Sequence, residues 1–186
     1  MRRIRYQVAA SLDGYIAGPN GEADWITMDP DIDFAALFDQ FDTFIMGRAT
    51  FAAMVGQQGS GATPGKKTLV VSRTLRQQDH PDVTIVGDHL EKTVAALKKM
   101  PGKDIWLFGG GSLFRSLLEF RLVDTIEPAI IPVLLGGGIP LLPVSASQVK
   151  LKLTGHRIYE KSGIVLLEYA ISYPRRQKAK AKSSSP

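Results

Sequence analysis

The segment Gly47-Arg48-Ala49-Thr50 contains residue types that could bind phosphate. The apolar run before it, residues 43–46, is typical of a strand, and the residues after it have the pattern of a helix. Backbone N–H groups at a helix N-terminus are unpaired and favour anions, and a guanidinium and a hydroxyl there would add further donors. An ordinary strand-to-helix turn with a surface arginine has the same pattern, so the interpretation depends on other segments.

Two further strand ends carry related chemistry. Residues 104–108 read as a buried strand that leads into Gly109-Gly110-Gly111 and a helix, and glycines let a backbone come close to a ligand. The predicted strand 68–72 ends in Ser72-Arg73. A guanidinium binds phosphate oxygens in a fork, so this pair suits the 2′-phosphate of NADPH.

The order of these motifs resembles the dihydrofolate reductase superfamily, which carries M-G-R-x-T, then a strand ending in S-R or S-S, then G-G-G before a helix. The segment Ala10-Ser11-Leu12-Asp13-Gly14-Tyr15-Ile16-Ala17 resembles the S-L-D-G-x-I-A of the riboflavin-biosynthesis branch. That branch is the reductase half of a bifunctional deaminase-reductase. Residues 122–124 and 131–141 also look like its small stand-alone members, and the resemblance covers roughly residues 4–172.

The resemblance implies an NADPH site at the strand ends. The pyrophosphate would bind the helix start at residue 47 and the glycine turn, and the 2′-phosphate would meet the Ser-Arg pair. The loop at residues 10–17 would cover the nicotinamide. The expected cofactor-binding residues are Ala10, Ile16, Ala17, Gly47, Arg48, Ala49, Thr50, Ser72, Arg73, Phe108, Gly109, Gly110, Gly111, Ser112 and Leu113.

Two carboxylates are candidates for proton transfer. Asp31 lies sixteen residues before Gly47, which matches the carboxylate that binds the pterin ring in bacterial dihydrofolate reductases; a helix cap is the alternative. Glu127 lies sixteen residues after Gly111, where those enzymes have a threonine near that carboxylate. If the two carboxylates face each other, their repulsion would hold a proton on one of them near neutral pH. Glu127 can instead face solvent beside Pro128.

The resemblance also implies a substrate class. We expect an NADPH-dependent reductase that transfers a hydride to a pterin-like or ribosylamino-pyrimidine-like heterocycle, with Asp13 and Trp25 near the substrate. Riboflavin-pathway reductases usually have a glutamate where this chain has Phe108, so the substrate itself stays open. A true dihydrofolate reductase of low activity and a non-catalytic nucleotide-binding protein are the alternatives. A homodimer is kept open as the assembly.

Composition excludes several classes of protein. The chain has no cysteine, so disulfides, thiolate metal sites and a zinc deaminase of the cysteine type are ruled out. His80, His89 and His156 show no ligand spacing, and no metal is expected. Since no run of eighteen apolar residues occurs, no membrane span is predicted, and the expected location is the cytoplasm.

The net charge of +5 comes from the C-terminus. The last thirteen residues contain five basic residues and no acidic one, so the rest of the chain is charge-balanced. We expect a reductase domain over residues 1–173 and a disordered basic tail over 174–186. No aromatic residue lies among the tail lysines, so a nucleic-acid partner is not expected.

Periodicity predicts an α/β fold. Helical patterns, including residues 90–99 and 112–120, alternate with strand patterns, and residues 151–159 and 164–172 read as a hairpin around Ser162-Gly163. Pro128 interrupts the predicted strand 124–131, which indicates an edge or a bulge. We expect a dihydrofolate reductase-like, three-layer α/β/α architecture, with a mostly parallel central sheet and an antiparallel C-terminal hairpin.

Overall fold

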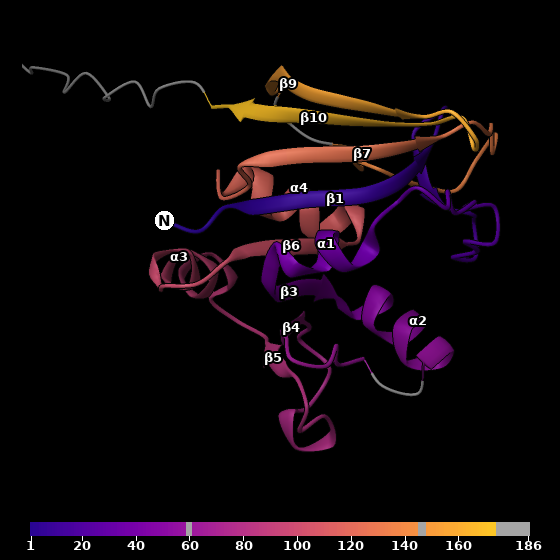
Figure 1. Ribbon diagram of the computed structural model, residues 1–186. Coiled ribbons are helices and arrows are strands. Elements are labelled where there is room, and N and C mark those ends of the chain that lie inside the picture. Colours follow the sequence, from indigo (N-terminus) through magenta and orange to yellow (C-terminus); the bar gives the residue numbers. More distant parts are fainter. Residues whose placement is uncertain (59–60, 145–147, 174–186) are drawn as a thin grey trace, which may run out of the picture.

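One eight-stranded sheet organises the computed structural model, which describes residues 1–58, 61–144 and 148–173 (Figure 1). The tail 174–186 lies outside the described residues. The strand order is β5-β4-β3-β6-β1-β7-β10-β9. Six strands are parallel, and the last two form an antiparallel hairpin. The strands are β1 (Ile4–Ser11), β3 (Phe41–Gly47), β4 (Lys67–Val71), β5 (Thr84–Val86), β6 (Asp104–Gly109), β7 (Thr125–Ile131), β9 (Lys150–Tyr159) and β10 (Ile164–Ser172).

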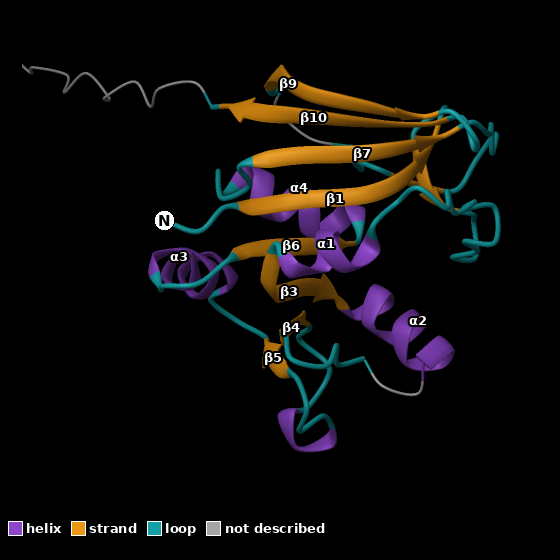
Figure 2. Ribbon diagram, in the orientation of Figure 1, coloured by secondary structure: helices purple, strands orange, loops and turns teal. Residues whose placement is uncertain are grey.

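Helices cover both faces of this sheet (Figure 2). Phe38 and Phe51, from helices on one face, belong to a cluster that also contains Phe44 of β3 and Trp106 of β6. The predicted three-layer α/β/α architecture, with its parallel sheet and C-terminal hairpin, is confirmed. The helices are α1 (Phe34–Asp39), α2 (Arg48–Gln58), α3 (Leu90–Lys99) and α4 (Gly111–Glu119), with a short 3-10 helix, η1 (Gln77–Asp79).

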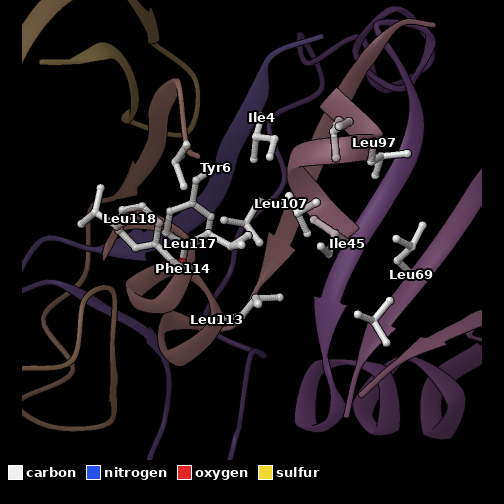
Figure 3. Packing of buried hydrophobic residues seen from close by; sticks show 14 of the residues in the cluster. Ile4, Tyr6, Ile45, Leu69, Leu97, Leu107, Leu113, Phe114, Leu117 and Leu118 are labelled. Atoms are coloured by element: carbon white, nitrogen blue, oxygen red, sulfur yellow. The ribbon is translucent and has the colours of Figure 1, made fainter. Parts of the chain in front are cut away.

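The larger core lies between the sheet and the helices α3 and α4 (Figure 3). Tyr6 of β1 stacks on Phe114 of α4 with ring centroids 4.1 Å apart. The buried residues of α4 include positions 113, 114, 117 and 118, the spacing of a helix that turns one apolar stripe toward a core. Leu97 of α3 and Leu107 of β6 belong to the same cluster. This packing fixes the start of α4 directly after the end of β6.

A second, small sheet includes part of the loop that was expected at residues 10–17. β2 (Tyr15–Ala17) pairs antiparallel with β8 (Ile139–Pro140). The two strands are more than a hundred residues apart in sequence. Gly138 has a φ of +146°, and a Cβ there would lie 2.2 Å from the carbonyl oxygen of Ala17. Glycine is therefore required at this position by the close pairing of the two segments.

Pro128 indicated an edge strand or a bulge, and the edge alternative is wrong for β7. β7 lies between β1 and β10, and Pro128 pairs in register with Val8. Proline lacks an N–H group, so it cannot donate to a neighbouring strand. The paired positions between β7 and β10 skip residues 127 and 128, and they resume in the same register at Ile126. The strand thus continues through Pro128 with a local gap in its ladder.

A buried ion pair joins β1 to β7. The Arg5 guanidinium donates to both carboxylate oxygens of Glu127, from Nε at 2.8 Å and Nη2 at 2.6 Å. The side chains are 9% and 4% exposed, so the prediction that Glu127 faces solvent is wrong. Thr125 also donates to this carboxylate, and Gln40 accepts from Arg5. Burial alone would lower the pKa of Arg5, but the hydrogen bond and charge of Glu127 raise it above its ordinary value.

Glu127→Ala should destabilise the protein by about 3–5 kcal/mol, because the buried Arg5 guanidinium loses its two short hydrogen bonds and keeps only the longer ion pair with Asp104, at 3.7 Å. The exposed pair Arg115–Glu119 of α4 provides the matched control. Glu119→Ala should change stability by less than about 0.5 kcal/mol. Urea unfolding measured for both variants checks this expectation. A loss below about 1 kcal/mol for Glu127→Ala would show that the pair is not a determinant of stability.

Candidate functional site

The two glycine motifs meet at one edge of the sheet. β3 and β6 are parallel neighbours, and Met46 pairs with Gly109, so both strands end side by side. A Cβ on Gly47 would lie 3.9 Å from the carbonyl oxygen of Gly109 and 4.0 Å from the nitrogen of Gly110. Thr50, in the first turn of α2, has its hydroxyl 3.6 Å from where a Cβ of Gly110 would stand. We call this arrangement of Gly47, Thr50, Gly109 and Gly110 the glycine notch.

The glycine notch is bordered by two helix N-termini. α2 begins at Arg48 and α4 begins at Gly111, immediately after the strand ends. A Cβ on Gly110 would meet only the Thr50 hydroxyl within 4 Å, so the space above the backbone is open. Arg48 is exposed and forms no ion pair within the described part of the chain. Two sets of unpaired N–H groups and a free guanidinium therefore surround an open space, which suits a diphosphate.

The three consecutive glycines have different physical roles. Gly109 has a φ of +141° and is joined to Gly110 by a cis peptide bond, so residue 109 needs the left-handed region that favours glycine. A Cβ on Gly111 would instead lie 2.6 Å from the carbonyl oxygen of Pro140 and 3.0 Å from that of Leu141. The chain itself therefore requires Gly111, whereas Gly109 and Gly110 border the notch.

The residues after the glycine turn divide between surface and core. Ala49 of α2 and Ser112 of α4 are exposed near the notch. Leu113, predicted to bind cofactor, has its side chain in the main core and donates its N–H to the carbonyl of Gly110. Its contribution is therefore to hold the turn, because neither its side chain nor its N–H is available to a ligand.

The end of β4 presents Arg73 rather than Ser72. Ser72 is 7% exposed, and its hydroxyl accepts hydrogen bonds from the backbone nitrogens of Thr74 at 3.2 Å and Leu75 at 3.1 Å. This serine therefore stabilises its own turn. Arg73 is exposed and has no ion pair among the described residues. Because β4 is the neighbour of β3, this guanidinium lies one strand away from the notch.

The loop after β1 is held by Asp13. Its carboxylate accepts hydrogen bonds from the Ser11 hydroxyl at 2.6 Å and from the backbone nitrogens of Leu135 and Gly136 at 3.1 and 2.7 Å. The hydrogen bonds from Ser11, Gly136 and Leu135 lower the pKa of Asp13 below its usual value. The carboxylate predicted to contact substrate thus fastens one loop to another.

The other residues predicted in the covering loop belong to strands β1 and β2. Ala10 is buried at the end of β1, and Ile16 and Ala17 are half-buried in β2. Trp25, also predicted to contact substrate, packs against Ile131 and Tyr159, and its indole N–H donates to the carbonyl of Glu22 at 3.1 Å. The tryptophan ring therefore packs against a small apolar cluster, and its indole N–H already has a hydrogen-bond acceptor.

The prediction that Asp31 and Glu127 share a proton is wrong. Asp31 is half exposed and accepts from Lys161 at 2.8 Å, whereas Glu127 is buried against Arg5. Each carboxylate thus pairs with a different cation, which does not support a shared proton. Asp31 is also not the helix cap, since Asp33 accepts from the backbone nitrogen of Ala36 and caps α1.

Asp29, which the sequence patterns did not single out, fixes the segment before α1. Its carboxylate accepts from the backbone nitrogens of Asp31 at 2.8 Å and Ser162 at 3.0 Å. The hydrogen bond from Ser162, in the turn between β9 and β10, lowers the pKa of Asp29. The side chain is 3% exposed, which agrees with a structural role.

Gln7 was missed in the sequence and is one of three residues, with Tyr6 and Thr68, that have a buried side-chain polar atom without a hydrogen-bond partner among the described residues. Strand alternation places it on the same face as Arg5, which contacts the Phe41 ring and Gln40 beside α1. The Oε1 atom of Gln7 is buried and has no hydrogen-bond partner. Its backbone carbonyl accepts from the Trp106 indole at 2.9 Å, and Trp106 packs on Phe108 with ring centroids 5.4 Å apart. An unsatisfied amide therefore lies close to the strand that leads into the notch.

Two cavities lie away from this edge. One of about 450 Å³ is at the opposite ends of the strands, where Arg2, Thr43, Lys66 and Pro101 contribute to its walls. Its polar groups are already used, since Arg2 pairs with Asp42 and Lys66 donates to two backbone carbonyls. A smaller one, about 170 Å³, lies beside Phe51 and His80. The strand ends, which carry the unpaired cations and the open glycines, are the better candidate site.

Metal and membrane features are absent from the described segments. Within residues 1–58, 61–144 and 148–173, no group of three or more histidine or acidic side chains is arranged to hold a metal ion. No helix in those same ranges is long and apolar enough to cross a membrane.

One family model and two proteins of Bacillus subtilis are similar in sequence to this chain. The model of the RibD C-terminal domain family matches residues 2–165. The uncharacterized protein YyaP of Bacillus subtilis (strain 168) is 37% identical over 179 residues, which covers 90% of this chain and 94% of YyaP. YwjB of the same strain is 29% identical over 157 residues, with 83% and 90% covered.

Solved structures show the same fold. A Shewanella sp. PV-4 protein assigned to riboflavin biosynthesis superposes with a TM-score of 0.77 at 27% identity, covering 93% of this chain and all of that one. The dihydrofolate reductase of Enterococcus faecalis, solved with NADP(H) and RAB-propyl, gives 0.68 at 18% identity, covering 92% and 97%. The predicted dihydrofolate reductase-like fold is therefore confirmed. Together with the family match over residues 2–165, these likenesses show that the chain belongs to the RibD C-terminal domain family.

Proposed function

We propose that this protein is an NADPH-dependent reductase that transfers a hydride to a pterin-like or ribosylamino-pyrimidine-like heterocycle. The observation that carries the proposal is the order of the strand ends along the sheet. Arg73 follows β4, the glycine notch follows β3 and β6, and the covering loop at residues 10–17 follows β1. These four strands are consecutive neighbours in the sheet. The 2′-phosphate, the pyrophosphate and the nicotinamide of NADPH follow one another in the same order.

The residues at this edge fit such a cofactor. Neighbouring strands are roughly 4.8 Å apart, so Arg73 is about one strand spacing from Gly47 and about two from Gly109. Arg48 and Thr50 would hold the pyrophosphate at the start of α2, and Ser112 would meet it at the start of α4. When bound, NADPH supplies the hydride. The chain itself supplies position and a site closed to bulk water.

The α1 side of the sheet is the proposed place for the heterocycle. A buried amide oxygen without a partner is unfavourable by about 1–3 kcal/mol, so Gln7 suggests a functional need. Pterin and pyrimidine rings carry N–H groups at their edges, and one such group would satisfy Oε1 of Gln7. Phe108 is the residue before Gly109, and its half-buried ring would guide the substrate toward the nicotinamide. Relatives named for riboflavin biosynthesis support this substrate class.

The protein should prefer NADPH to NADH, because the exposed Arg73 would form a charge-assisted contact with the 2′-phosphate. Such a contact is worth roughly 1.5–3 kcal/mol, about ten- to a hundredfold in affinity. Arg73→Ala should remove this preference, whereas Arg76→Ala, on the same exposed segment, should keep it. Titration calorimetry with both cofactors measures the effect. Equal affinities of the wild type for NADPH and NADH would show that Arg73 does not bind the 2′-phosphate.

Gly110→Val should abolish NADPH binding while the fold is retained. Gly110 has an extended backbone, with φ −94° and ψ −173°, which valine adopts readily. The added side chain would fill the notch beside Thr50. Gly56→Val is the control, because Gly56 lies later in α2 with no atom within 4 Å of an added Cβ. Wild-type affinity in a folded Gly110→Val protein would mean that the notch does not hold the cofactor.

Gln7→Leu should reduce turnover and leave stability unchanged or raised by about 1 kcal/mol, because a buried unpaired amide is removed. Its NADPH affinity should stay at the wild-type value. Asp31→Asn tests the competing site, and we expect its kcat to change less than twofold because Asp31 lies in an exposed pair with Lys161. NADPH oxidation with a panel of heterocycles, together with thermal melting, measures both. Loss of kcat in Asp31→Asn alone would return the proton-donor role to Asp31.

A further inference from the structure

Strand β10 carries a carboxylate without a partner. Glu168 is half-buried, and its carboxylate makes no hydrogen bond or ion pair with any residue in the ranges 1–58, 61–144 and 148–173. Glutamate side chains are mostly exposed, and they are paired where they are buried. An unpaired carboxylate that has lost part of its water therefore needs an explanation.

The strand register places Glu168 in one row with Gln7 and Glu127. Gln7 of β1 pairs with Glu127 of β7. Tyr169 pairs with Ile126 in the antiparallel ladder between β10 and β7, so the residue before Tyr169 lies opposite the residue after Ile126. Because Tyr169 packs on the α4 side, Glu168 points to the α1 side. β1, β7 and β10 are neighbours (Figure 1), so Gln7 and Glu168 are two strand spacings apart, roughly 10 Å.

The charges in this row do not balance. Arg5 donates to both carboxylate oxygens of Glu127, so Glu168 is a second negative charge beside a pair that is already complete. Burial works to lower the pKa of Arg5, and Glu168 is one of the charges that raise it, with a smaller effect than Glu127. Like charges on directly opposite residues of two strands are destabilising. Repulsion by Glu127 thus opposes the attraction of Glu168 to Arg5, and stability does not account for the carboxylate.

Two cations of β9 lie near this carboxylate without pairing with it. Glu168 pairs in register with Gly155, and Lys152 and Arg157 lie on the same side of the hairpin, before and after that glycine. The Arg157 guanidinium lies over the Tyr159 ring, 4.6 Å from its centroid. Lys152 is exposed and forms no ion pair within the described segments. The carboxylate oxygens of Glu168 are therefore available to a ligand.

Small residues surround the row on the α1 side. A Cβ on Gly155 would lie 3.0 Å from Oε2 of Glu168, so the carboxylate lies flat over this glycine. Ala9 and Ala129 pair with each other two residues beyond Gln7 and Glu127, toward the carboxyl ends of β1 and β7, and both are half-buried. Short side chains therefore line the face between the strand ends and the unpaired carboxylate.

We propose that Glu168 binds the hydroxyl groups of a sugar-type substituent on the substrate. The inference rests on the proposed function, which places the heterocycle beside Gln7 and Phe108. A substituent that points away from the nicotinamide would extend over β7 toward β10. The two oxygens of a carboxylate only accept hydrogen bonds, so two neighbouring hydroxyls can each donate to one of them.

This assignment narrows the substrate class. It favours a ribosylamino-pyrimidine-like compound over a pterin-like one that lacks hydroxyl groups at this distance. The family model matches residues 2–165, so Glu168 lies outside the part of the chain that the model covers. Selection by this residue is thus a property of this chain's own C-terminal strand.

The test compares two ligands that differ only in the substituent, a uracil with a ribitylamino group and the same uracil with a methylamino group. Titration calorimetry is done on the full chain with NADP⁺, so that no hydride is transferred. The wild type should bind the ribityl compound at least about tenfold more tightly, as for hydrogen bonds to a charged group. Glu168→Gln should reduce this preference to less than about threefold. Its affinities for NADP⁺ and for the methylamino compound should not change.

Glu160→Gln is the matched control, because Glu160 is an exposed carboxylate in the turn directly after β9. It should keep the full preference, and an equal loss in this variant would contradict direct contact with Glu168. A lower melting temperature in Glu168→Gln with an unchanged preference would show that the residue serves only the fold. Equal binding of both ligands by the wild type would overturn the inference, while NADPH oxidation with the methylamino compound would keep the proposed function. Failure to bind either ligand or NADPH would overturn both.

A second variant keeps the charge and changes only the place of the carboxylate. Gly155→Val would fill the position over which the Glu168 carboxylate lies, and valine suits a strand, so the fold should be retained. The preference for the ribityl compound should fall as it does in Glu168→Gln. A folded Gly155→Val protein with the wild-type preference would contradict binding at this position.

Discussion

The parallel pairing of β3 with β6 determines where this chain brings the N-termini of two helices together. It places Gly47 beside Gly109, and each strand then continues directly into a helix. Neither motif would be a site alone, because one helix N-terminus offers a single set of N–H groups. Side by side, the two helix starts create an open space that is bordered by backbone donors. β4 then adds Arg73 from the next strand position, so the sheet register determines the spacing between charges.

The sequence indicated these strand ends because the signal there is local. An apolar run followed by glycine and a helix can be recognised within ten residues. The partners of the two carboxylates could not be predicted, since Arg5 and Glu127 are 122 residues apart in the chain. Counting a fixed distance from a glycine assumes loops of constant length. It therefore placed Asp31 opposite Glu127, whereas the fold gives each a different cation.

The other differences between the sequence predictions and the structure arise from the topology of the sheet. Pro128 cannot donate a hydrogen bond, which suggested an edge strand, yet β7 lies inside the sheet with a gap in one ladder. Whether a strand is central depends on strands that are distant in the sequence. The strand that covers the outer side of β7 is β10, which comes more than thirty residues later in the chain. β2 and β8 were missed for the same reason, because two or three residues become a strand only through a distant partner. Gln7 was missed because an unsatisfied amide has no sequence signature.

The Asp13 carboxylate has a mechanical consequence for the cofactor edge. It fastens the loop after β1 to the backbone of Leu135 and Gly136, and β2 fastens the same loop to β8. The carbonyls of Pro140 and Leu141, just after this junction, press against Gly111 at the start of α4. The segment from Leu135 to Leu141 therefore contacts both the loop after β1 and the glycine turn. Any displacement of the loop after β1 would therefore also displace the segment that packs against the start of α4.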